Sequence, residues 1–167
     1  MASQIASAAV DTETRSSARP SIGVMGGWMK PNHGLSGRFN YGLEIAFQPQ
    51  DPWSLGLQIY TSKKTDAFGN SNTITPLLLK GVYNYGSSMG MSNFYMGAKT
   101  GIAWLSGSSS LFNVSATSTS FAIGPVVGAD YNLCPQFSMG AEVAYLFLLA
   151  SGSPDHLTAD ALLKYWF

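Results

Sequence analysis

From Ser21 to Phe167 the sequence repeats one pattern, in which about ten residues of alternating apolar and polar character are followed by a polar break. The clearest segment is Arg38–Gln48, where every second residue is a large apolar one. These residues are Phe39, Tyr41, Leu43, Ile45 and Phe47. Because successive side chains of a strand point to opposite faces, each segment predicts a strand with one apolar face.

Eight segments follow this pattern. We predict strands at about Ser21–Met29, Arg38–Gln48, Trp53–Ser62, Ile74–Tyr85, Asn93–Leu105, Ser120–Asn132, Phe137–Leu148 and Leu157–Phe167. Short breaks alternate with longer ones, the short ones being Pro49–Pro52, Gly86–Ser92 and Leu133–Gln136. This order is typical of barrels with short periplasmic turns, longer external loops and both termini on the periplasmic side.

The low charge of the chain indicates a membrane. Charged residues make up 11% of the sequence, against about 25% in an ordinary soluble domain. No apolar stretch approaches the roughly 20 residues of a spanning helix, Ala144–Ala150 being among the longest. Only helices and closed barrels satisfy the backbone in lipid. The sequence therefore predicts an all-β fold, an eight-stranded antiparallel up-and-down transmembrane β-barrel, rather than a soluble sandwich with an aromatic core.

The alternate set of side chains should face the barrel interior, and it contains seven charged residues. We predict that these form a lumen charge network of Glu44, Lys80, Lys99, Asp130, Glu142, Asp160 and Lys164. An eight-stranded barrel is just wide enough for side chains to fill it, and buried charges must pair. Plausible bridges are Glu44–Lys80 and Glu142–Lys164, with Lys99 joining either acid. The same residues would also fit a gated ion path.

Candidate catalytic residues are few. The two histidines are His33 and His156, both in predicted external loops. A set of Ser153, His156 and Asp155 or Asp160 would suit acyl transfer, although the segment also reads as an ordinary polar turn. We predict no enzyme activity, no metal site and no cofactor. The single cysteine, Cys134, has no partner for an internal disulfide.

Two regions are predicted to lie outside the strands. Residues 1–19 are rich in Ser, Ala and Thr and predict a flexible lead-in, leaving the barrel at 20–167. We take the absence of a secretory signal in this stretch to mean that the signal was removed. The segment Ser106–Ser120 predicts a mobile external loop in which Leu111, Phe112 and Val114 pack on the loop itself or make an oligomer contact.

The three stretches Ala161–Phe167 (ALLKYWF), Phe94–Trp104 (FYMGAKTGIAW) and Phe121–Leu133 (FAIGPVVGADYNL) resemble the small eight-stranded outer-membrane β-barrel family, which is similar to the membrane domain of outer-membrane protein A. The resemblance implies a bacterial outer membrane. It also implies that Leu163, Tyr165 and Phe167 form a signal read by the barrel-assembly machinery. In size, the chain also looks similar to porin-like lipid-trapping barrels of predatory bacteria.

Three functions fit these observations. The first is a non-enzymatic barrel with a side-chain-filled lumen and a structural or interaction role at the envelope. The second is a porin-like barrel that forms a homo-oligomeric ring enclosing lipid, and the third is a rim-active lipid A-modifying enzyme. The expected partners are outer-membrane lipid, the assembly machinery and a second copy of the chain. Zero net charge gives no reason to expect nucleic acid.

Overall fold

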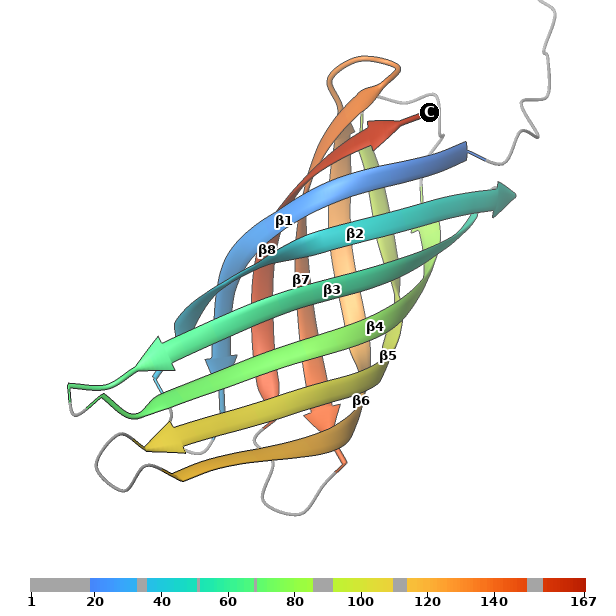
Figure 1. Cartoon of the computed structure of the whole chain (residues 1–167). Helices are drawn as coiled ribbons and strands as arrows, with labels where there is room; N and C mark the ends of the chain where they lie inside the picture. The colour runs from blue at the N-terminus through green and yellow to red at the C-terminus, as the bar shows by residue number, and fades with distance from the viewer. Residues whose placement is uncertain are drawn as a thin grey trace, which may run out of the picture.

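The computed structural model describes residues 19–32, 36–50, 52–67, 69–85, 92–109, 114–149 and 155–167, with the backbone alone at 49, 50, 109 and 114. It forms a closed barrel in which each strand pairs with its neighbours in sequence and β8 returns to β1 (Figure 1). All pairings are antiparallel. Within the described ranges, no helix has the length and apolar character to cross a membrane.

The predicted strand order is confirmed. The strands are β1 (Arg19–Pro31), β2 (Arg38–Gln50), β3 (Trp53–Thr65), β4 (Ser71–Tyr85), β5 (Ser92–Ser109), β6 (Val114–Asn132), β7 (Phe137–Leu148) and β8 (His156–Trp166). Strand β1 begins and β8 ends at the same end of the barrel (Figure 1). Residues 1–18 of the predicted lead-in lie outside the described residues. Its last residue, Arg19, is the first residue of β1.

The period-two pattern of the sequence becomes the two faces of the wall. In β2, Phe39 and Tyr41 are about 60% exposed on the outside, whereas Asn40 and Glu44 are buried inside at 0% and 1%. Large apolar residues remain exposed on the outer face of every strand. An exposed apolar surface of this extent requires a hydrocarbon environment.

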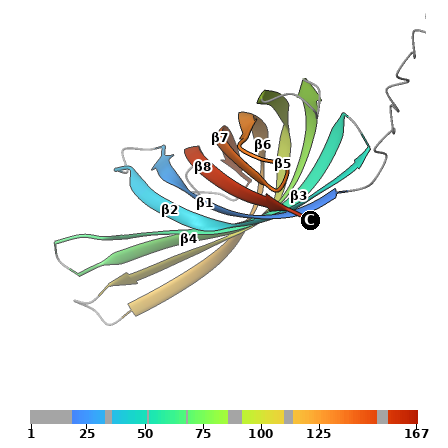
Figure 2. The ribbon, with the colours of Figure 1, turned by 90° about the horizontal axis from the view of Figure 1, so that it is seen from above.

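The prediction of a mobile loop at Ser106–Ser120 was wrong, because the described residues on both sides of 110–113 extend two paired strands. Strand β5 continues to Ser109 and β6 starts at Val114, and the two remain paired to their ends. Thr and Val favour the strand, and Ser106 and Thr117 share a hydroxyl hydrogen bond of 3.3 Å. Figure 2 shows the β3–β4 and β5–β6 hairpins reaching past the ends of β1 and β2. Leu111 and Phe112 lie outside the described residues.

Two prolines interrupt the ladders without breaking the strands. The predicted strand Ile74–Tyr85 would place Pro76 near a strand start, but β4 begins at Ser71, so Pro76 lies inside the strand. The β3–β4 register has no pair between Ile59↔Leu77 and Ser62↔Ile74, and the β6–β7 register has a similar gap opposite Pro125. Proline has no N–H to donate, so a local gap in one ladder accommodates it.

The barrel interior has an apolar layer beside its polar one. The larger cluster contains Met25, Met29, Tyr60, Ile74, Leu78, Ala103, Ala122, Leu146, Leu148 and Leu162. The smaller one contains Val82, Tyr95, Val126 and Ala144. Leu78 and Leu146, from opposite sides of the strand order, are both fully buried. Side chains therefore fill the external half of the lumen, as expected for eight strands.

Candidate functional site

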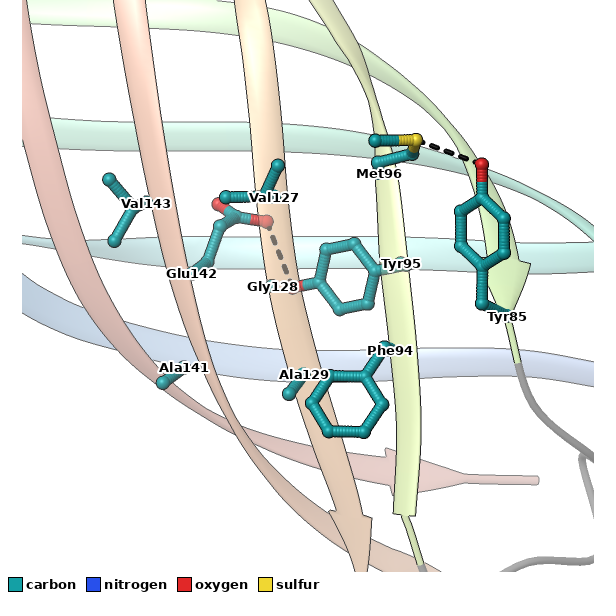
Figure 3. Close-up of a pocket in the computed structure, with 10 residues that line it drawn as sticks. All are labelled: Tyr85, Phe94, Tyr95, Met96, Val127, Gly128, Ala129, Ala141, Glu142 and Val143. Carbon is teal, nitrogen blue, oxygen red and sulfur yellow. Dashed lines mark hydrogen bonds between the residues drawn. The ribbon is translucent and has the colours of Figure 1, made fainter.

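The centre of the lumen is organised around Glu142 of β7, which is 1% exposed. Its Oε1 lies 2.5 Å from the Lys99 ammonium, and its Oε2 lies 3.2 Å from that of Lys80. The Tyr95 hydroxyl also donates to Oε2 at 3.1 Å (Figure 3). Because Lys99 is completely buried and Glu142 is its ion-pair partner among the described residues, the two charges compensate each other.

A second acid, Glu44 of β2, shares its cations with the first. Lys80 donates to Glu44 Oε2, which is the predicted Glu44–Lys80 ion pair. Gln58 donates through one nitrogen to both Glu44 and Glu142. Lys80 therefore lies between two carboxylates. The Gln58 amide donates to the same two carboxylates.

Lys164 belongs to the other side of this cluster, which corrects the predicted Glu142–Lys164 bridge. Its ammonium lies 2.8 Å from Asp130 and 3.4 Å from Glu44. Glu142 instead pairs with Lys80 and Lys99. Although β7 and β8 are neighbours, Lys164 pairs in register with Ser138 rather than with Glu142. Register, which the sequence does not reveal, selects the partner.

Asp160 is the one acid of the network that makes no ion pair among the described residues, although it is only 4% exposed. Its carboxylate lies over Gly27, because a Cβ at this glycine would overlap Asp160 Oδ1. Asp160 pairs in register with Gly27, which in turn pairs with Asn40. Gly27 has no side chain, and this leaves room for the Asp160 carboxylate.

Two neutral members of the network, Gln58 and Tyr95, were not among the predicted site residues. Lys80 and Lys164 lie 5.4 and 5.5 Å from the centre of the Tyr95 ring, close enough for cation–π attraction. Both neutral residues share the inward parity of their strands. Their alternate positions in the strands indicate that both side chains face the interior, but only charged residues were predicted as members of the network.

Long lumen side chains lie over glycines of neighbouring strands. A Cβ at Gly128 would overlap the Tyr95 ring, and one at Gly140 would overlap the Asp130 carboxylate. At Gly23 it would lie 3.1 Å from the Lys164 side chain. Alternation of small and large residues fills a narrow interior, which explains the inward glycines of the strands.

The candidate catalytic histidine is part of the lumen packing. His156 is the first residue of β8, 0% exposed, and it pairs in register with Leu146 and Pro31. The Asp155 carboxylate accepts the backbone N–H of Leu148 at 3.0 Å. Ser153 and His33 lie outside the described residues. No group of three His, Cys, Asp or Glu side chains in the described part of the chain could hold a metal ion.

The residues proposed as an assembly signal lie along the outer face and end of β8. Leu163 and Tyr165 are exposed, and Phe167 is 69% exposed just after the strand. The Tyr165 ring lies 5.1 Å from both Phe137 and Phe167. Recognition of these residues by an assembly machinery stays a prediction.

An apolar outer wall, a closed antiparallel ladder and an ion-paired interior define a transmembrane β-barrel with a filled lumen. The chain belongs to the outer membrane protein beta-barrel domain family, whose model matches residues 1–162. It is therefore a bacterial outer-membrane protein. No curated protein sequence matches it.

Solved structures share the fold at low sequence identity. Neisserial surface protein A superposes with a TM-score of 0.72 at 12% identity, covering 90% of this chain and 97% of that one. Ail, the attachment invasion locus protein of Yersinia pestis, gives 0.61 at 15%, covering 90% and 99%. The N-terminal barrel of Pseudomonas aeruginosa OprF gives 0.57 at 16%, covering 90% and 100%.

Proposed function

We propose that this protein is a non-enzymatic outer-membrane barrel whose lumen is a structural core and whose external hairpins carry an interaction role. The observation that carries this proposal is the occupation of the interior. Glu142, Glu44 and their lysines lie beside a buried apolar cluster that includes Leu78 and Leu146. A lumen whose charges are paired and whose remaining width is filled with apolar side chains favours rigidity over passage.

The β5–β6 extension is the surface that we propose for interaction. Its Ser115–Thr119 segment is exposed, uncharged and paired to β5, while the β6–β7 ladder begins only at Ala122. An unpaired strand edge can accept an extended segment of a partner. A related barrel, Ail of Yersinia pestis, has been solved in complex with the heparin analogue sucrose octasulfate, so a barrel of this fold can bind a ligand.

The filled lumen predicts a protein that does not conduct. In planar lipid bilayers, we expect the purified full chain to give no stable single-channel current, because the Lys99–Glu142 pair and the apolar cluster occupy the interior of the barrel. A porin inserted into the same bilayers serves as the positive control. Stable current steps that change in the Lys99→Ala variant would support an ion path and contradict the proposal.

A second prediction separates this proposal from lipid A modification. Cells producing the protein and cells producing its His156→Ala variant should contain the same lipid A species by mass spectrometry. The reason is that the His156 side chain is 0% exposed, so a lipid substrate does not reach it. As a control, heat-modifiable gel migration should show that the wild type and the variant are both folded in the membrane. A lipid A species that disappears only with the variant would establish the enzyme instead.

A further inference from the structure

The outer wall of the barrel contains a groove between β5, β6 and β7. It has a volume of about 460 Å³, and Figure 3 shows the residues that line it. Its bulky lining residues, among them Phe94, Met96 and Val143, are exposed on the outer face. The two polar residues that border it, Tyr95 and Glu142, are buried and hydrogen-bonded to each other. The groove therefore opens to the membrane and offers an apolar surface.

The floor of the groove continues across the barrel in one register row. Ala129 pairs with Ala141, Ala141 with Ala161, and Ala161 with Gly26. The adjacent row on the periplasmic side is bulky and exposed, with Tyr131, Met139, Leu163 and Val24. A shallow trench of small residues, bounded on its periplasmic side by larger side chains, thus extends from the groove to β1.

The row rises through one leaflet. Phe94 is the third residue from the periplasmic end of β5, and Gly26 is the eighth residue from that end of β1. Four strand spacings separate them, or roughly 19 Å at about 4.8 Å each. With strands tilted about 45°, the row climbs about 13 Å, close to half of the roughly 30 Å hydrocarbon core.

We propose that this groove and its trench hold one acyl chain of a phospholipid from the periplasmic leaflet. The surrounding solvent at this depth is hydrocarbon, and the row begins beside Tyr85 and Phe94, aromatic residues of the kind found at headgroup level. The headgroup lies near these rings, and the chain follows the small residues toward the membrane centre. A chain lying on the small residues of the floor also contacts the larger side chains beside it, such as Phe94 and Met96, and so gains contacts that a flat barrel wall does not provide.

Native mass spectrometry tests the proposal with full-length protein. The protein is extracted in mild detergent from vesicles of phosphatidylethanolamine, phosphatidylglycerol and lipopolysaccharide. Wild type should retain one phospholipid. The Ala141→Phe variant should lower the lipid-bound fraction about tenfold, the equivalent of displacing about two methylene groups. Ala161→Phe, higher in the same row, should lower it less and serves as a second variant if Ala141→Phe does not fold.

The matched control is Ala98→Phe, which adds the same ring to an exposed outer alanine of β5 that does not line the groove. It should retain phospholipid like the wild type. Equal retention by Ala98→Phe and Ala141→Phe would overturn the proposal. So would retention of lipopolysaccharide in place of phospholipid, or a lipid-free dimer that only Ala141→Phe dissociates, which would assign the groove to a second copy of the chain.

Discussion

Replacing Glu142 by alanine should lower the free energy of unfolding by about 3–5 kcal/mol, the usual cost of removing one partner of a buried ion pair. The carboxylate is the ion-pair partner of Lys99, which is 0% exposed, and it also accepts from Lys80 and Tyr95. Without it, the buried Lys99 ammonium has no ion-pair partner in the described part of the chain. Urea unfolding in detergent micelles, followed by tryptophan fluorescence and gel migration, measures the change.

Two control variants separate the charge from the packing. Asp130→Ala removes an acid whose side chain is 12% exposed and whose partner Lys164 keeps Glu44 at 3.4 Å, so it should cost about 1 kcal/mol. The double variant Lys99→Met with Glu142→Gln removes one charge of each sign and should recover most of the loss. A Glu142→Ala protein as stable as wild type would show that the network does not hold the barrel together.

The fold could be predicted from sequence because the pattern that encodes it is local. Alternation with period two over Arg38–Gln48 sets the two faces of β2, and the lengths of the breaks set the order of turns and loops. The positions of the strand ends were harder to predict from the sequence. The β5–β6 extension is rich in serine and threonine, without the apolar face that marks a strand in lipid, and was therefore predicted as a loop.

The contents of the lumen could be predicted, but its pairing only in part, since Glu44–Lys80 is present and Glu142–Lys164 is not. Parity assigned Glu44, Glu142 and Lys164 to the interior, where the structure places them. Which acid meets which lysine depends on the stagger between strands, and in a closed barrel the stagger is a global property. Lys80 reaches Glu142 across the lumen from β4 to β7, a contact that no neighbouring-strand argument supplies.

Alanine at Gly124 should destabilise the barrel by about 3 kcal/mol, at the upper end of the cost of overpacking. A Cβ at this position would lie on the backbone carbonyl oxygen of Tyr145, and no rotamer change moves a backbone atom. Gly124 lies within β6, next to Pro125, where the ladder to β7 has a gap between Ile123↔Phe147 and Val126↔Ala144. Urea unfolding and the folded fraction on a gel measure the effect.

Gly107→Ala is the matched control, because a Cβ there would meet nothing within 4 Å. It should change the free energy of unfolding by less than about 0.5 kcal/mol, or raise it slightly by restricting the unfolded chain. The comparison measures the steric effect of the added methyl group alone, because neither glycine has a positive φ, unlike Gly69 at 79°. Equal effects of the two substitutions would mean that β7 shifts to admit the new methyl group. The β6–β7 strand pair would then be a deformable part of the barrel wall, and a shift of β7 would widen the groove beside it.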